Sequence, residues 1–66
     1  MLFLVIVKDK HGGIHHINPH YVRSLKEDGD GTIITFADGG TLAVIEKTNH
    51  LTQRLEQSTR NIRLVA

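Results

Sequence analysis

The sequence contains no cysteine and no tryptophan, and it has a single proline, one tyrosine and two phenylalanines among 66 residues. The lack of cysteine excludes disulfide bonds and zinc or iron–sulfur sites with cysteine ligands, and it is compatible with a cytoplasmic protein. A chain this short is near the lower limit at which a hydrophobic core alone keeps a domain folded. We therefore expect one domain over residues 1–66 that either closes a complete core or shares it with a second copy.

The sequence also lacks a strong charge of either sign. The sequence contains eight Lys and Arg residues and seven Asp and Glu residues, which gives a formal net charge of +1. This balance differs from the basic excess that is typical of proteins that bind phosphate backbones. The longest apolar run is too short to span a bilayer, and it has neither a preceding basic region nor a following small-residue cleavage site. We expect a cytoplasmic protein that does not bind a membrane.

That apolar run, Met1–Val7, is the most informative feature that is present. A β-strand sends successive side chains to opposite faces. One face of this strand would carry Leu2, Leu4 and Ile6, and the other would carry Phe3, Val5 and Val7. A strand that is apolar on both faces requires either a closed barrel or a partner chain.

Polar turns separate short stretches of β-forming residues, a pattern typical of an antiparallel meander. Gly12-Gly13 can supply the positive φ angle of a hairpin turn, and Asn18-Pro19 predicts one tight turn over residues 19–21. Imperfect alternation indicates a bulge near Arg23 and Ser24. The predicted strands are Met1–Val7, Ile14–Ile17, a strand marked by Tyr21, Val22 and Leu25, Thr32–Phe36 and Thr41–Ile45.

The hydrophobic period changes after the fifth predicted strand. Thr48 or Asn49 can cap a helix that continues to about Ser58, with Leu51 and Leu55 on one face. Two leucines make a narrow apolar stripe, so this helix must pack on the sheet or on another subunit. The alternation in Asn61–Ala66 predicts a final strand. The predicted fold is mainly β: a strongly bent antiparallel β-meander or small SH3-like barrel of about five strands, with one short C-terminal helix and a final strand.

Five histidines and several carboxylates are the candidate metal ligands. His15 and His16 point to opposite faces of a strand, so they cannot bind one ion together, and His16 and His20 converge only across the Asn18-Pro19 turn. The acidic loops lack the distal glutamate of a calcium-binding loop, and their composition is that of hairpin turns. We expect no metal site and no cofactor. The residues considered were His11, His15, His16, His20, His50, Glu27, Asp28, Asp30 and Asp38.

No nucleophile, base and acid can be assembled into a catalytic group from their spacing. A domain of this size also has little room for the concave pocket that an active site occupies. We therefore expect a protein that is not an enzyme.

The features from Lys8 to about Glu56 follow a recognisable order. They are a hairpin with Gly12-Gly13, then Ile17-Asn18, hydrophobic residues at Val22 and Leu25, the pattern Thr32-x-Ile34-x-Phe36, a glycine turn, Val44 and a short closing helix. This order resembles small bacterial flagellar proteins of the FlbD/SwrD type. The resemblance implies a non-enzymatic accessory or regulatory protein. The sequence departs from that pattern in its longer apolar start, its histidines and its Ile62–Val65 tail.

Our first hypothesis is a bacterial or phage-like interaction module that binds itself, and in addition a protein partner that the sequence does not identify. Burial of the second face of the first strand would stabilise an oligomer at about 25 cal/mol per Å² of apolar area. The predicted interface residues are Leu2, Phe3, Leu4, Val5, Ile6, Ile62 and Leu64.

The alternative hypothesis is a DNA- or RNA-binding regulator with a basic surface near its C-terminus. The meander is also similar to the β-rich DNA-binding domains of LytTR type. Such a protein would lose affinity steeply as salt is added. The candidate nucleic-acid contacts are Lys8, Lys10, Arg54, Arg60 and Arg63.

Overall fold

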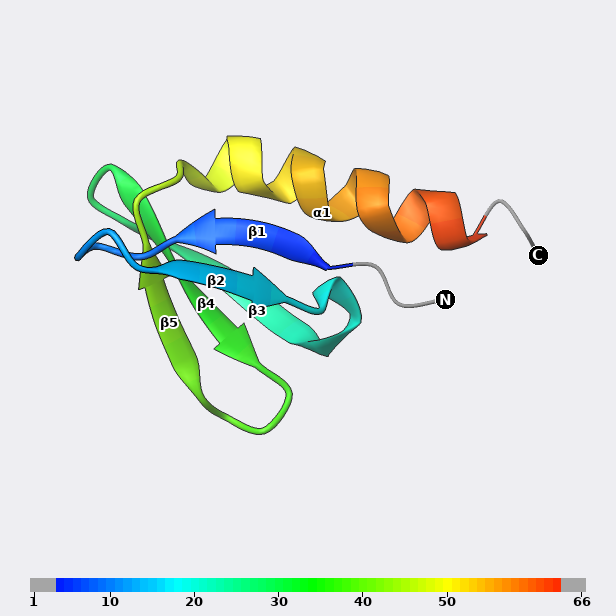
Figure 1. The fold of residues 1–66 in the computed structure, drawn as a ribbon, viewed down its shortest axis with the longest axis horizontal. Helices are drawn as coiled ribbons and strands as arrows, with labels where there is room; N and C mark the ends of the chain where they lie inside the picture. The colour runs from blue at the N-terminus through cyan, green and yellow to red at the C-terminus, as the bar shows by residue number, and fades with distance from the viewer. Residues whose placement is uncertain (1–3, 64–66) are drawn as a thin grey trace.

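A computed structural model describes the backbone of residues 4–63 and the side chains of residues 4–58. The described chain is mainly β, with five strands in two antiparallel sheets and one α-helix (Figure 1). The elements are β1 (Val5–Lys8), β2 (Ile14–Ile17), the 3₁₀-helix η1 (Pro19–Tyr21), β3 (Val22–Asp28), β4 (Gly31–Phe36), β5 (Thr41–Val44) and α1 (Thr48–Arg63).

The two sheets are a hairpin of β1 and β2 and a three-stranded meander in the order β3-β4-β5. They meet where Asp9 forms an isolated bridge with Val44 and the Ile45 N–H donates to the Lys8 carbonyl at 3.1 Å. The hairpin lies across the meander, and α1 runs alongside β1 (Figure 1). The predicted mainly β fold with antiparallel strands is confirmed, and its strands form two sheets. Within residues 4–63 these strands do not close into a barrel, so the SH3-like barrel is not confirmed.

The predicted turns follow from local sequence and are confirmed. Gly12 adopts φ +87°, a conformation that other residues rarely tolerate, at the turn between β1 and β2. The Asn18 side chain accepts a hydrogen bond from the His20 N–H at 2.9 Å, and Pro19 begins η1. The register of β3 against β4 shifts between Val22 and Ser24, which is the expected bulge.

The core lies between the hairpin, the meander and α1. β1 and β2 contribute Val5, Val7 and Ile17, the meander contributes Ile34 and Val44, and α1 contributes Leu51 and Leu55. The two leucines are four residues apart, so they share the helix face that packs inward, as their spacing predicts. The helix therefore covers a part of the core that the strands leave open.

The C-terminal end of the chain differs from the prediction. Helix α1 continues to Arg63, five residues beyond Ser58, so the predicted final strand is wrong over residues 61–63. No glycine or proline occurs between Thr48 and Arg63 to end the helix. The remaining residues of the predicted strand, Leu64–Ala66, lie outside the described residues.

The two faces of β1 have different environments. Val5 and Val7 are 6% and 2% exposed, whereas Leu4 and Ile6 are 47% and 49% exposed. The alternation predicted for the apolar run is therefore confirmed for residues 4–7, and one of its two apolar faces is open to solvent. Met1–Phe3 lie outside the described residues.

Among residues 4–63, no helix combines the length and apolar character that crossing a bilayer requires.

We expect Leu51→Ala to lower the free energy of unfolding by about 2–5 kcal/mol, because it leaves a cavity where a fully buried side chain joins α1 to the sheets. The exposed Gln53 on the same helix is the matched control, and Gln53→Ala should change stability by no more than about 0.5 kcal/mol. Urea denaturation followed by circular dichroism measures both values. Equal losses for the two variants would show that α1 does not pack on the core through Leu51.

Candidate functional site

Exposed aliphatic side chains gather on the outer side of the β1–β2 hairpin. Leu4 and Ile6 share a face of the first strand because they are two residues apart. Ile14 of β2 lies opposite Lys8, which places it on this same face. Ile45, directly after β5, lines a groove together with Ile6 and Ile14. We call Leu4, Ile6, Ile14 and Ile45 the outer patch.

The outer patch contains most of the large exposed hydrophobic surface of the described residues. Ile14 and Ile45 are 56% and 54% exposed, and Leu4 and Ile6 are each about half exposed. Outside the patch, Tyr21 is the other large hydrophobic residue exposed to a similar degree among residues 4–58. Single exposed hydrophobic residues are ordinary, but a cluster on one face marks an interaction surface.

The groove within the outer patch has a volume of about 410 Å³. Its apolar lining comes from Ile6, Val7, Ile14 and Ile45, and its polar lining comes from Lys8, Glu46, His50 and Arg54. It is shallow and open, so it fits a protruding side chain of another chain better than an enclosed small molecule.

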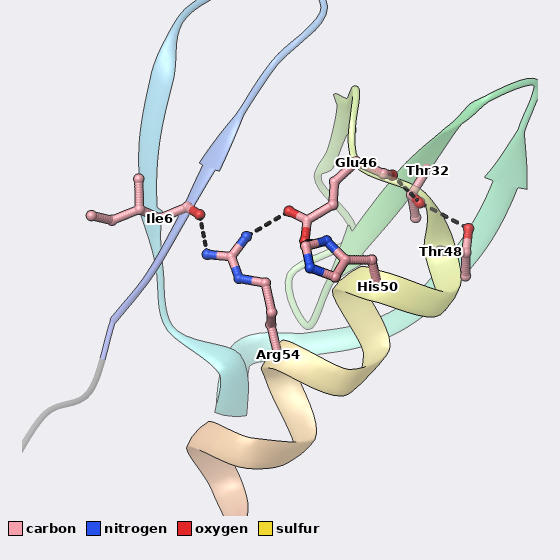
Figure 2. A network of polar contacts seen from close by, with 6 residues as sticks. All are labelled: Ile6, Thr32, Glu46, Thr48, His50 and Arg54. Atoms are coloured by element: carbon pink, nitrogen blue, oxygen red, sulfur yellow. Dashed lines mark hydrogen bonds and ion pairs between the residues drawn. The ribbon is translucent and has the colours of Figure 1, made fainter.

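Arg54 holds the edge of β1 on the side away from β2. Its Nη2 donates to the Ile6 carbonyl at 2.6 Å, and its Nη1 donates to Glu46 Oε1 at 2.5 Å. Figure 2 shows the Ile6 carbonyl directed at the guanidinium, whereas the Ile6 side chain points away from this network. The planar guanidinium can donate hydrogen bonds to both acceptors at once, because its N–H groups point in fixed directions. A lysine ammonium lacks this arrangement of donors. Arg54 therefore fixes the strand that presents the outer patch.

Glu46 is the acidic centre of the same network. Its side chain is 13% exposed, and its Oε2 lies 2.6 Å from Nδ1 of His50. This buried oxygen makes no hydrogen bond with the described residues, so its approach to His50 is a close contact of an acidic and a basic group and not a hydrogen bond.

Thr32 of β4 holds the segment between β5 and α1 through its side-chain hydroxyl. Its fully buried side chain donates to the Glu46 carbonyl at 2.8 Å and lies 2.8 Å from the Thr48 hydroxyl (Figure 2). Because a hydroxyl has one proton, the Thr48 hydroxyl is the donor in the second contact. Thr48 thus begins the helix with its side chain bound to β4. The Leu51 N–H makes the first turn by donating to the Lys47 carbonyl at 2.9 Å.

Asp9 organises the turn that carries Ile14. Its Oδ2 lies 2.7 Å from His15 Nε2, and its Oδ1 accepts from the backbone N–H groups of Gly13 and His11, each at 2.8 Å. The hydrogen bond with His15, followed by those two backbone bonds, lowers the Asp9 pKa from 3.8 to about 2. The carboxylate therefore stays ionised and holds the turn throughout the neutral range.

The predicted nucleic-acid contacts do not form one free basic surface within the described side chains. Lys10 Nζ lies 2.8 Å from Asp28 Oδ2, a contact that lowers the pKa of the Asp28 carboxyl. Arg54 is bound to Glu46 and Ile6, while Lys8 is exposed and borders the groove with Arg54. Arg60 and Arg63 belong to α1, but their side chains lie outside the described set.

The predicted association residues divide into three groups. Leu4 and Ile6 lie on the outer patch, whereas Val5 faces the core and is too buried to contact a partner. Ile62 is part of α1 instead of a final strand, and its side chain is not among those described. Leu2, Phe3 and Leu64 lie outside the described residues.

Ile14 and Ile45 complete the patch although the sequence did not single them out. Alternation gave a partial signal for Ile45, because Leu42 and Val44 occupy the opposite face of the same predicted strand. Ile14 required the register of β1 against β2, which the sequence does not contain.

Among the described residues, no three histidine or carboxylate side chains come together as metal ligands would. The acidic and histidine side chains that do meet form two separate pairs, Asp9 with His15 and Glu46 with His50.

Comparisons of the chain with protein-family models, with curated proteins and with solved structures found no match. The resemblance to flagellar proteins of the FlbD/SwrD type therefore stays a prediction.

We expect Arg54→Ala to lower the free energy of unfolding by about 1.5–3 kcal/mol, because it removes charge-assisted hydrogen bonds and leaves Glu46 without its cation. Arg23 is an exposed residue of β3, and Arg23→Ala serves as the matched control with a change within about 0.5 kcal/mol. Chemical denaturation compares the two. A loss no greater for Arg54→Ala than for Arg23→Ala would contradict the role assigned to this network.

The lowered pKa of Asp9 predicts a specific acid sensitivity. The folded-state pKa of about 2 lies below the ordinary value of 3.8, so the stabilisation is present above pH 3.8 and is lost as the pH falls toward 2. Asp9→Asn should flatten this part of the stability curve. Thermal melts between pH 2 and pH 5 measure the effect, and NMR titration of the Asp9 carboxyl gives its midpoint directly. A midpoint near 3.8 would contradict the described turn.

Proposed function

We propose that this protein is a small non-enzymatic interaction module that self-associates through the outer patch. The observation that carries the proposal is the clustering of half-exposed Leu4, Ile6, Ile14 and Ile45 on one face, around a shallow groove. Soluble proteins seldom leave a contiguous apolar surface open unless something binds there.

The sequence offers a second copy as the simplest partner. A symmetric dimer uses the same patch on both subunits, so the exposed aliphatic side chains of one copy can pack against those of the other. Lys8 is exposed on this face of β1 between Ile14 and Ile45, and its long side chain lets the ammonium group extend into solvent while the aliphatic part packs with them. Complete burial of an aliphatic side chain contributes about 1.5–3 kcal/mol, so four half-exposed side chains contribute roughly 3–6 kcal/mol per subunit.

A nucleic-acid function is less well supported. Of the five basic residues expected to contact phosphates, Lys10 and Arg54 already have acidic partners. Release of Arg54 for a phosphate would remove the guanidinium from the largely buried Glu46 carboxylate, which opposes binding, whereas the exposed Lys10–Asp28 pair opposes it only weakly.

We expect Ile6→Lys to reduce self-association while leaving the fold intact, because the side chain is exposed and points away from the Arg54 network. Tyr21→Lys is the matched control, since Tyr21 is 47% exposed and lies outside the patch. Light scattering over a concentration series measures the mass, and circular dichroism verifies folding. The proposal fails if the wild type is monomeric at all concentrations, or if both variants associate equally.

A further inference from the structure

The edge of β2 that faces away from β1 has no neighbouring strand within residues 4–63. An antiparallel pair alternates between residues that exchange hydrogen bonds and residues whose backbone groups point outward. Ile6 and Lys8 of β1 point outward, because their carbonyl groups accept hydrogen bonds from α1 and from the segment after β5. Their partners His16 and Ile14 therefore direct their own N–H and C=O groups away from β1, toward the free edge of β2.

The other strand edges of the described chain carry features that hinder pairing. Arg54 binds the free edge of β1, a bridge from Val44 to Asp9 closes the end of β5, and β3 contains arginine, lysine, glutamate and aspartate. Charged residues and covering contacts are common ways to protect a sheet edge from other chains. β2 consists only of isoleucine and histidine, and its outward-directed residues Ile14 and His16 are both exposed. Its edge is therefore the least protected among the described strands.

A second copy of β2 fits this edge in one register. Hydrogen bonds form across the new pair where outward-directed residues face each other. Ile14 opposite His16 of the second copy meets this condition twice, once on each side of the two-fold axis, with His15 of both copies on the axis. Registers with Ile14 or His16 opposite itself would pair the other residue with Gly12 or Asn18. The backbone of both is already hydrogen-bonded within a turn.

The space beside β2 also suits this register. A shallow groove of about 330 Å³ is lined by His16 and Ile17 of β2 and by Thr41 at the start of β5. The register places Gly13 of the second copy opposite Ile17, and Gly12 follows it along the chain. Residues without a side chain therefore arrive where the second copy comes nearest to the start of β5.

We propose that two copies of the chain pair their β2 strands antiparallel, which joins two β1–β2 hairpins into one four-stranded sheet. A hairpin of two strands has little stability of its own, and a wider sheet stabilises it. This contact is separate from the outer patch and goes beyond the proposed association through it. The two outer patches lie on the same face of the joined sheet, so a chain that uses both contacts forms assemblies larger than a dimer.

Removal of an outward N–H group tests this contact. His16→Pro deletes a donor that does not pair with β1, and proline is tolerated at such a position of an edge strand. His16→Ala is the matched control, because it removes the same side chain and keeps the N–H. Both are made in the Ile6→Lys chain, so that the outer patch does not contribute. Each symmetric dimer loses two hydrogen bonds with proline, so its dissociation constant should be at least about tenfold higher than with alanine by sedimentation.

Hydrogen exchange measured by NMR on the unmodified chain reports on the edge itself. The Ile14 and His16 amides should exchange quickly at low protein concentration and become protected at high concentration. The His15 and Ile17 amides are internal controls, because they pair with β1 and should be protected at both concentrations. Protection of Ile14 and His16 in a chain that is monomeric by mass would contradict the proposed pairing.

The lack of native cysteine permits a crosslinking test. Residues opposite each other on the axis form a pair without hydrogen bonds, with Cα atoms about 4.5 Å apart, which is within the range of a disulfide. His15→Cys should therefore give a disulfide-linked dimer under mild oxidation. His20→Cys is the control, because His20 is exposed but lies outside β2. Equal crosslinking of the two variants would contradict the register.

The outcomes separate this inference from the proposed function. If Ile6→Lys is monomeric at every concentration and the Ile14 and His16 amides of the wild type stay unprotected, the outer patch alone mediates association and the pairing of β2 is wrong. If both amides gain protection while Ile6→Lys associates like the wild type, β2 pairs and the outer patch does not mediate association. If the wild type is monomeric at every concentration, both proposals fail. Concentration-dependent protection together with weaker association of His16→Pro supports the inference.

Discussion

The position of β1 depends on contacts along an edge that has no full neighbouring strand. On one side β1 pairs with β2. On the other side two single hydrogen bonds replace a neighbouring strand: Arg54 donates to the Ile6 carbonyl, and the Ile45 N–H donates to the Lys8 carbonyl. The guanidinium is itself held by Glu46, which is tied through its own backbone to the buried Thr32. This chain of polar contacts links α1, the meander and the hairpin. The packing of Val5 and Val7 on the core requires the strand to stay in that place.

Capping this edge decides which part of β1 is available to a partner. An uncapped strand edge invites pairing with another chain through its backbone. Arg54 is hydrogen-bonded to the Ile6 carbonyl, and the bridge between Asp9 and Val44 of β5 covers the edge just after β1. A strand added along this edge would have to displace both contacts. What remains open is the face with its apolar side chains. The structure therefore favours packing of side chains over backbone pairing at β1.

Local signals in the sequence account for most of the fold. Asn18-Pro19 defines η1, a glycine with positive φ defines the first hairpin turn, and β-branched runs define the strands, since each is specified within a few residues. The sequence does not reveal where α1 ends, because the alternation in residues 61–63 is also compatible with a helix, and no glycine or proline stops it. The contacts of Arg54 span 8 and 48 residues along the chain, so no local pattern reveals them. The apolar face of β1 was predictable, whereas its completion by Ile14 and Ile45 depends on register and on the crossing of the two sheets.

The near-neutral charge of the chain also has a structural meaning. Asp9, Asp28 and Glu46 are each bound to a basic side chain, so two of the positive charges in the sequence, on Lys10 and Arg54, are paired with carboxylates within the fold. The Glu46–Arg54 pair lines the groove of the outer patch, and the Asp9–His15 pair holds the turn that carries Ile14, so these pairs keep in place the strands that present the apolar side chains. One apolar run then serves two purposes, because its inward residues stabilise the subunit and its outward residues remain free to contact another chain. Since the two sets alternate along a single strand, charge substitutions at even and odd positions separate stability from association.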